Sequence, residues 1–244
     1  MRDWGRELYL RVLDELRVAA GGSLVDVGCG GGQLCRLAAG RGARVTGIDT
    51  DPAVLARAGD AVPGGRFLRA DLHELPLPPG EASATSCVQV LMHLPNPLAA
   101  LRELHRVAAP GGRVAVTVWG PPETCAVGAF GDALAPVLGP PPWRVDRGRT
   151  SGPPPLHAEG RLARLTTLAG LTVTGDAEVR CAFDYPGETE LLTTLYAADI
   201  GRRAIALAGR RPVRRAVLDG LASHRLADGG YRLWNTFRMV VGER

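Results

Sequence analysis

Lysine is absent from this chain of 244 residues, so all 29 basic side chains are arginines. The absence excludes a lysine that forms a Schiff base with a carbonyl substrate. It also excludes the Gly-x-x-x-x-Gly-Lys-Ser/Thr phosphate loop, which needs a lysine beside the phosphates. The formal net charge of +4 is small for this length. It is a weak indication of nucleic-acid binding, and we expect no nucleic-acid partner.

Long apolar runs and paired cysteines are missing as well. No stretch reaches the roughly 18 consecutive apolar residues that a membrane-spanning helix needs. Residues 1–7 carry acids and lack the apolar core of a signal peptide. The five cysteines are scattered and form no Cys-x-x-Cys pair, which is typical of reduced thiols rather than of a disulfide framework or a zinc site. We therefore expect a cytoplasmic protein with no membrane partner and no metal.

The first half of the chain alternates short apolar runs with amphipathic stretches. Strands are expected at residues 23–27, 44–49, 66–71, 84–91 and 113–119. Helices are expected at residues 3–18 and 33–39, from the Asp51-Pro52 start onward, and at 97–108. Strands that alternate with helices are typical of an open parallel sheet with right-handed crossovers.

The pattern changes after residue 119. Proline and glycine dominate residues 120–158, which we interpret as a loop or lid with one short helix near 124–138. Beyond it we expect a helix at 159–169, a strand at 171–182, helices across 188–224 and a last strand at 231–241. The predicted organisation is a cofactor-binding core with an N-terminal helix (1–119), a lid insertion (120–158) and the C-terminal part of the same domain (159–244), whose residues 188–224 form a helical substrate cap.

Four of the five residues from Gly28 to Gly32 are glycines, and they follow the first expected strand directly. An open α/β sheet binds its ligand at this place, outside the carboxyl ends of the strands. Asp49 ends the second expected strand, where an acid can accept hydrogen bonds from two ribose hydroxyls. The spacing therefore predicts a cofactor that carries a nucleoside.

Two features distinguish this loop from a dinucleotide site. The third small residue of the dinucleotide fingerprint is replaced by Gln33, which is too large for close packing of helix on strand. Asp26 puts a carboxylate at the expected mouth of the loop. A carboxylate there would repel a pyrophosphate and would suit a ligand with an ammonium group.

These residues resemble the class I S-adenosyl-L-methionine (SAM)-dependent methyltransferases, and among them the small-molecule branch that includes the quinone-biosynthesis enzymes. The resemblance rests on residues 25–32, 47–49, 70–76, 89–97, 101–112 and 230–241. It implies an α/β fold with a Rossmann-like sheet of seven strands, mostly parallel with an antiparallel last strand. It also implies helices on both faces and a lid of helices and loops.

The resemblance also implies which residues hold SAM and its product S-adenosyl-L-homocysteine. The expected set is Asp26, Gly28, Cys29, Gly30, Gly32, Asp49, Thr50, Asp71, Leu72 and Gln89. Asp26, the glycine loop and Gln89 would face the methionine part. Asp49 would take the ribose hydroxyls, and Asp71 would take the adenine amino group with the Leu72 backbone beside it. The alternative for Asp71 is a turn or cap residue, and the alternative for Cys29 is a small side chain that fills the loop.

His93 is the candidate catalytic base, because it follows the fourth expected strand at the carboxyl edge of the sheet. Histidine titrates near neutral pH, as a base for a hydroxyl acceptor requires. The alternative is a histidine that packs under the lid or caps the next helix. The candidate substrate-binding residues are Trp4, Tyr9, His93, Trp119 and Tyr185.

Missing motifs narrow the reaction. The Asn/Asp-Pro-Pro-Tyr/Phe motif of amino-group methyltransferases is absent, and residues 86–89 read Ser-Cys-Val-Gln. A metal-dependent enzyme needs clustered Asp or Asn ligands near the fourth and fifth strands, where only Asn96 stands. We expect metal-free transfer of a methyl group to an O, N or C atom of a small, largely apolar metabolite, by a monomer or homodimer.

Two other functions stay open at this point. A methyltransferase fold can hold SAM as a fixed cation while it catalyses a cyclisation or rearrangement. An RNA or protein methyltransferase is the second alternative, and its support is a group of arginines: Arg202, Arg203, Arg210, Arg211, Arg214 and Arg215.

Overall fold

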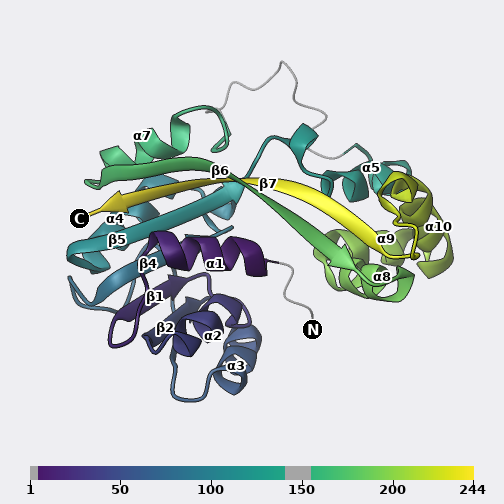
Figure 1. The fold of residues 1–244 in the computed structure, drawn as a ribbon. Coiled ribbons are helices and arrows are strands. Elements are labelled where there is room, and N and C mark those ends of the chain that lie inside the picture. The colour runs from purple at the N-terminus through teal and green to yellow at the C-terminus, as the bar shows by residue number, and fades with distance from the viewer. Residues whose placement is uncertain (1–4, 141–154) are drawn as a thin grey trace. The chain divides into compact units, whose positions relative to one another are not determined.

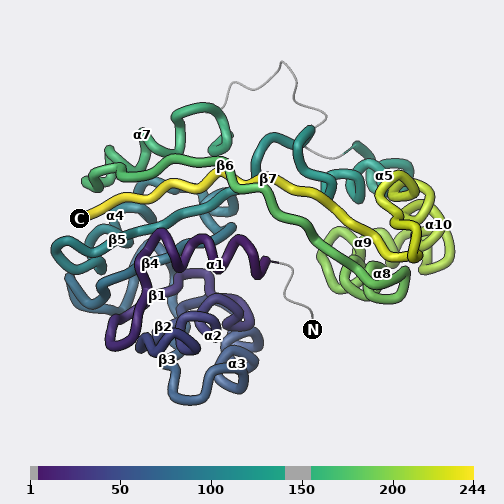
Figure 2. Tube along the Cα trace, viewed as in Figure 1, coloured from purple at the N-terminus to yellow at the C-terminus, as the bar shows by residue number. Residues whose placement is uncertain are grey.

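Seven strands form one mixed sheet in the computed structural model, which describes residues 5–140 and 155–244 (Figure 1). The strands are β1 (Ser23–Val27), β2 (Arg44–Asp49), β3 (Arg66–Arg69), β4 (Ala82–Val88), β5 (Ala108–Trp119), β6 (Thr172–Tyr185) and β7 (Tyr231–Glu243). They follow the order β3-β2-β1-β4-β5-β7-β6, in which β3 lies beside β2 at one edge (Figure 2). The pairs from β3 to β5 are parallel, whereas β7 runs antiparallel to β5. The predicted Rossmann-like fold class is confirmed.

The chain divides into two compact units. The first contains Met1–Trp119, Pro154–Val179 and Phe237–Arg244, and the second contains Gly120–Pro153 and Arg180–Thr236. Strands β6 and β7 therefore contribute residues to both units. The functional division into core, lid and cap that the sequence predicts stays a prediction.

Helices cover both faces of the sheet in the first unit. These are α1 (Arg6–Glu15), α2 (Gln33–Gly40), α3 (Pro52–Ala61), α4 (Pro97–Val107) and α7 (Arg161–Leu168). Helices α1, α2 and α3 lie together on one side of the sheet, and α4 and α7 lie on the other (Figure 1). Successive side chains of β1 point to opposite faces of the sheet. Val25 and Val27 join the core beside α4, whereas the Asp26 carboxylate contacts Cys35 of α2.

The described residues of the second unit form helices and their connections, apart from the ends of β6 and β7. It contains α5 (Gly128–Leu138), α8 (Glu188–Ala197), α9 (Asp199–Ala208) and α10 (Arg210–Gly220), with short 3-10 turns at η2 (Pro122–Thr124) and η3 (Ala222–His224). Helix α5 packs against α9 and α10. Their buried side chains include Leu134 and Val217, which gives this unit an apolar interior of its own.

Several boundaries differ from the sequence expectation by a few residues, and three of the differences have a clear local cause. Strand β4 ends at Val88 and not at residue 91, because Gln89 adopts a left-handed φ of 62° that cannot continue a strand. Strand β5 begins at Ala108, directly after α4, because a register shift in its pairing with β4 absorbs the Pro110-Gly111-Gly112 turn. Helix α1 ends at Glu15, since Arg17 is left-handed and Val18 N–H closes the helix on the Leu13 carbonyl.

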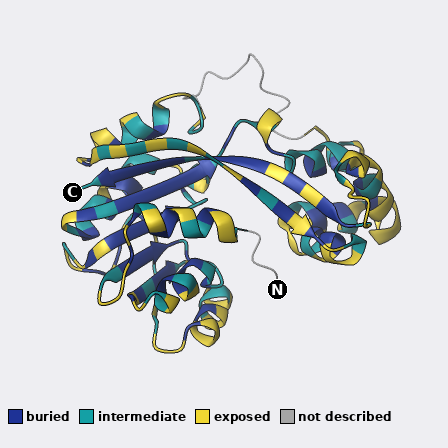
Figure 3. Ribbon diagram, in the orientation of Figure 1, coloured by how far each residue is buried: buried dark blue, intermediate teal, exposed yellow. Residues whose placement is uncertain are grey.

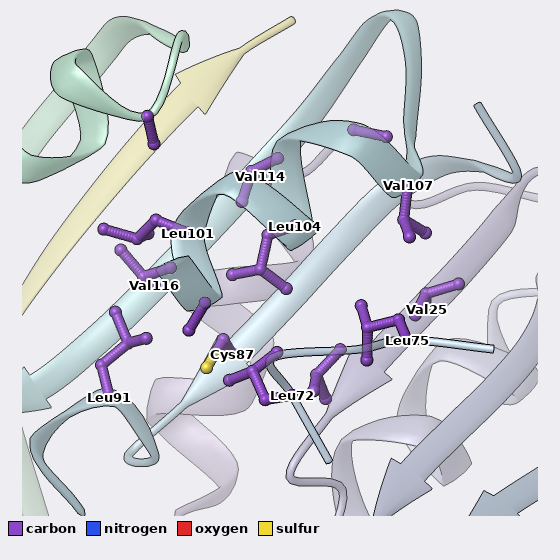
Figure 4. Close-up of a cluster of buried hydrophobic side chains, with 14 of the residues drawn as sticks. Val25, Leu72, Leu75, Cys87, Leu91, Leu101, Leu104, Val107, Val114 and Val116 are labelled. Atoms are coloured by element: carbon purple, nitrogen blue, oxygen red, sulfur yellow. The ribbon is translucent and has the colours of Figure 1, made fainter. Parts of the chain in front are cut away.

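The main core of the first unit lies between the sheet and α4. Leu101 and Leu104 of α4 are fully buried and belong to one cluster with residues of β4 and β5 (Figure 4). Figure 3 shows the central strands of the sheet largely in the colour of buried residues. Leu72 and Leu75, from the segment after β3, enter the same cluster (Figure 4). The strands β1, β4 and β5 are thus buried on both faces, as expected for a parallel sheet.

Leu101→Ala should lower the free energy of unfolding by about 2–5 kcal/mol, because it opens a cavity in a side-chain cluster that excludes water. Leu168→Ala is the matched control, since Leu168 at the end of α7 is 55% exposed whereas Leu101 is 0% exposed. Urea unfolding of both variants measures the difference. Equal losses in the two variants would contradict this assignment of the core.

Candidate functional site

The glycine loop between β1 and α2 is fastened to the end of β2. The backbone N–H groups of Gly28 and Cys29 both donate to the carbonyl oxygen of Ile48, at 2.7 and 3.0 Å. The Gly30 N–H donates to Asp49 Oδ2 at 3.0 Å. Backbone donors and one carboxylate therefore hold the loop at the carboxyl edge of the sheet.

Two of the loop glycines are needed for different reasons. Gly28 has a φ of 75°, and a Cβ there would lie 2.1 Å from Cγ2 of Val90, so a neighbouring side chain excludes any other residue. Gly30 has a φ of 51°, but a Cβ there would meet no protein atom within 4 Å. The loop is therefore closed at Gly28 and open at Gly30, where a ligand can approach the backbone.

Asp26 lies inside β1 and is buried, although the sequence places it at the mouth of the loop. Its carboxylate accepts a hydrogen bond from Ser86 Oγ at 2.7 Å and a weak one from Cys35 Sγ at 3.7 Å. Burial raises the pKa of the Asp26 carboxyl from 3.8 to about 6, against the lowering effect of these two donors. Ser86 was missed in the sequence because its contact depends on the β1–β4 register, which pairs Asp26 with Ser86.

Asp49 ends β2 and accepts hydrogen bonds with both carboxylate oxygens. Besides Gly30, its Oδ1 accepts from the Asp51 N–H at 3.1 Å. Each carboxylate oxygen has more than one lone pair, so this side chain keeps acceptor capacity for a ligand. Thr50 is exposed beside it, and its carbonyl oxygen accepts from Arg69 Nε at 3.2 Å.

Asp71 follows β3 and is exposed. Its Oδ1 lies 2.8 Å from the His73 N–H and 2.7 Å from His73 Nδ1. These hydrogen bonds, the backbone one first, lower the pKa of the Asp71 carboxyl. Asp71 therefore makes the contacts of a turn residue, which is the alternative to its role at the adenine. Leu72 beside it buries its side chain in the core.

Gln89 stands at the end of β4 in an unusual conformation. Its left-handed φ of 62° is uncommon for a residue with a side chain and is often found at functional sites. Its N–H donates to the Thr117 carbonyl oxygen at 3.0 Å, and Nε2 donates to Thr117 Oγ1 at 3.0 Å. Its Oε1 is buried and has no hydrogen-bond partner among the described residues. A buried acceptor of this kind calls for a donor from a ligand or water.

Cys29 is a buried side chain within the loop. A Cβ added to Gly47 would lie 2.8 Å from its sulfur, so the thiol fills the space above β2. Burial, together with the charges of Asp26 and Asp49, raises the pKa of the Cys29 thiol to about 12. The thiol therefore stays protonated near neutral pH, as a side chain that fills space and not as a nucleophile.

His93 is exposed at the end of the 3-10 turn η1 (Leu91–His93), which packs against β5. Trp119 ends β5, with its ring 4.7 Å from that of Phe237. Tyr9 lies half-buried on α1. Tyr185 is buried in the second unit, where burial raises the pKa of its hydroxyl. Trp4 lies outside the described residues.

The first unit thus gathers the expected cofactor residues at one edge of the sheet, where the ends of β1, β2, β3 and β4 meet. The side chains that offer acceptors there are the carboxylates of Asp49 and Asp71 and the carbonyl of Gln89, whereas the buried carboxylate of Asp26 already accepts from Ser86 and Cys35. Such a set fits a ligand that is rich in donors and carries positive charge. Among the described residues, no three His, Cys, Asp or Glu side chains are grouped so that they could hold a metal ion.

A membrane-spanning helix is likewise not found in residues 5–140 and 155–244, none of whose helices is both long and apolar enough.

Comparison with known sequences agrees with this site. The family described as a methyltransferase domain matches residues 25–116, which include the glycine loop and the ends of the first four strands. A ubiquinone biosynthesis O-methyltransferase of Pseudomonas paraeruginosa is 39% identical over 114 residues, which are 44% of this chain and 48% of that protein. The chain therefore spans about half the length of the curated relatives it matches.

Solved structures share the fold over most of the chain. The crystal structure of the 4+2 cyclase SpnF has a TM-score of 0.57 and 22% identity, with 95% of this chain and 80% of that chain covered. Geranyl diphosphate C-methyltransferase from Streptomyces coelicolor A3(2) has a TM-score of 0.57 and 14% identity, with 98% and 79% covered. At these identities the likeness shows the fold alone.

Asp26→Asn should stabilise the protein at neutral pH more than at acidic pH. An acid whose pKa rises from 3.8 to about 6 on folding destabilises the folded state by roughly 3 kcal/mol once it is ionised. That destabilisation is absent below about pH 4, grows between about pH 4 and pH 6, and is constant at higher pH. The measurement is urea unfolding of both proteins at pH 4.5 and 7.5, and a difference between them that does not change with pH would contradict the burial of a titrating carboxyl.

Proposed function

We propose, from the match of residues 25–116 to the methyltransferase domain family, that this protein transfers a methyl group from SAM to a small molecule. The observation that carries the proposal is the set of acceptors around an open loop, above all Gln89 Oε1, which has no hydrogen-bond partner in residues 5–140 and 155–244. The ammonium group of SAM supplies donors for that atom. The ribose hydroxyls and the adenine amino group supply donors for Asp49 and Asp71.

The positive charge of SAM matches the acidic character of this edge. Burial is the main cause that raises the pKa of Asp26, and the charge of Asp49 nearby adds to it. A cation bound beside them favours their ionised forms, and a pyrophosphate would oppose them. Arg69, at the end of β3, directs its Nε to the Thr50 carbonyl and not to the loop.

SAM supplies an electrophilic methyl group on a sulfonium. The protein then has to align an acceptor atom and, where that atom belongs to a hydroxyl, to remove its proton. We assign the proton removal to His93, which follows Gln89 by four residues on the turn that packs against β5. The imidazole would take the proton as the bond from the acceptor oxygen to the methyl carbon forms and the bond from the sulfonium to that carbon breaks, which leaves S-adenosylhomocysteine.

The acceptor is a small, largely apolar molecule that is methylated on O, N or C without a metal ion. The name of the Pseudomonas relative favours an oxygen atom. Tyr9 and Trp119 in the first unit are the aromatic side chains we assign to the acceptor, and Tyr185 stays a prediction. Incubation with SAM and a panel of phenols and enols, with detection of S-adenosylhomocysteine, tests the activity.

The alternative functions give different results in the same assay. A cyclase or isomerase that uses SAM as a fixed cation would consume its substrate without forming S-adenosylhomocysteine. An RNA or protein methyltransferase would show steep salt dependence through the arginine group on α9 and α10. That group is partly neutralised, since Arg202, Arg214 and Arg215 each pair with an acid: Asp199, Glu188 and Asp219.

Asp49→Ala should weaken binding of S-adenosylhomocysteine about tenfold to a hundredfold, because two charge-assisted hydrogen bonds to the ribose are lost. Isothermal titration calorimetry measures the affinity. Asp51→Ala is the matched control, because the Asp51 carboxylate caps α3 through the Ala53 N–H and does not face the loop. Equal affinity of Asp49→Ala and the parent protein would remove Asp49 from the ribose site.

His93→Ala should lower kcat on a hydroxyl acceptor by about 10²–10⁴-fold, which is the usual contribution of a general base, and should leave SAM affinity within about twofold. His105→Ala on α4 is the control, because His105 lies on the helix and away from the strand ends. Initial rates and calorimetry give the two quantities. An unchanged kcat in His93→Ala would assign the proton transfer to another group or to solvent.

A further inference from the structure

The segment after β3 carries the candidate adenine contacts and is held by α4. Residues 71–80 contain no helix or strand. Leu72, Leu75 and Leu77 are nevertheless buried, with 4–5% of their surface exposed. Leu72 and Leu75 belong to the same buried cluster as Leu104 of α4 (Figure 4). Apolar burial is not directional, so it attaches the segment to the helix without fixing where its backbone lies along it.

An ion pair on α4 supplies the directional contacts. Arg106 Nε donates to Glu103 Oε1 at 2.7 Å, and Arg106 Nη2 donates to Glu103 Oε2 at 2.8 Å, so the two side chains form a bidentate pair. The same guanidinium donates to the carbonyl oxygens of Leu77 and Leu75, at 2.6 and 2.9 Å. Glu103 Oε2 also accepts from the Leu75 N–H at 2.9 Å.

Both backbone polar groups of Leu75 are therefore bonded to this one pair. The pairing has an electrostatic signature, since the hydrogen bond from Arg106 is the main cause that lowers the pKa of Glu103. The planar guanidinium group has enough N–H donors, at fixed angles, to bond two carbonyl oxygens and a carboxylate at once. The ammonium group of a lysine could not reproduce this set of hydrogen bonds.

A second contact ties the start of the segment to the start of α4. His73 Nε2 lies 3.2 Å from the carbonyl oxygen of Asn96, whose side chain caps α4 through the Ala99 N–H. His73 also bonds to Asp71. The two residues assigned to adenine are thus followed by contacts to both ends of one helix, and the helix is anchored by fully buried Leu101 and Leu104.

We propose that Glu103 and Arg106 are positioning residues, which hold the Leu75 backbone so that Asp71 and Leu72 lie where they meet the adenine edge. The inference rests on the proposed function, because it takes SAM as the ligand. Neither side chain touches the adenine. They act through the two residues between Leu72 and Leu75, a distance over which a loose backbone would lose its alignment.

The test is a comparison of two ligands in the full chain. S-adenosylhomocysteine carries the adenine amino group, and S-inosylhomocysteine has a carbonyl oxygen there, which reverses the donor and acceptor pattern of that edge. The parent protein should prefer the adenosyl ligand. Arg106→Lys keeps the charge but loses the fork, and it should reduce the ratio of the two affinities about fivefold or more by calorimetry.

A purely structural role would change both affinities by the same factor and leave their ratio intact. Arg102→Lys is the matched control, because Arg102 is exposed one turn earlier on the same helix, and its ratio should equal that of the parent protein. Glu103→Gln is a second variant that should reduce the ratio if Arg106→Lys proves too unstable to titrate.

The outcomes separate the two proposals. A parent protein that binds neither ligand would overturn both the proposed function and this inference. Normal preference in the parent protein with an unchanged ratio in Arg106→Lys and Glu103→Gln would overturn the positioning role alone.

Discussion

The fastening of the β1–α2 loop to the end of β2 is the contact on which the site depends. One carbonyl oxygen, that of Ile48, accepts from two successive N–H groups, and the Asp49 carboxylate accepts from a third. Because these acceptors belong to β2, the sheet and not α2 sets the position of the loop. The packing of Val90 on Gly28 then brings the end of β4 against the same loop. The parallel sheet thereby sets the positions of three strand ends relative to one backbone turn.

The same edge concentrates negative charge in a chain without lysine. Asp26 is buried with Ser86 and Cys35 and has no cationic partner among the described residues. A buried carboxylate of this kind opposes folding when it is ionised, and a solely structural position would be better filled by an amide or an apolar side chain. The cost lies at the place where a cationic ligand would reduce it. Stability given up at a site is a common sign of function.

The sequence predicted the parts of the fold that follow from local pattern. The strands β1 and β2 are short and rich in apolar residues, and β2 ends in Asp49. Asp51-Pro52 starts α3 where a cap and a first-turn proline should. The resemblance to class I methyltransferases is confirmed by the family match and by the sheet order. The roles assigned to single site residues remain predictions, since their test is a bound ligand.

The features that the sequence could not show depend on contacts between distant segments. The Ser86 contact to Asp26 needs the β1–β4 register, and the left-handed Gln89 has no signature in its neighbours. The start of β5 at Ala108 was missed because proline and glycine there indicated a turn, while the register shift opposite Ala82 accommodates them within the strand. The bonds from Arg106 to residues 75 and 77 span about thirty positions and were invisible as a pattern.

Helix α4 connects the two halves of the proposed cofactor site. Its first residues follow the turn that bears His93, so its start sets the methyl-transfer side of the site. Its last turns hold the segment that bears Asp71 through Glu103 and Arg106. Since Leu101, Leu104 and Val107 fix the helix against the sheet, a shift of α4 would move both sides together. The distance between the adenine and methyl ends of a bound cofactor is therefore set by one rigid element and not by two independent loops.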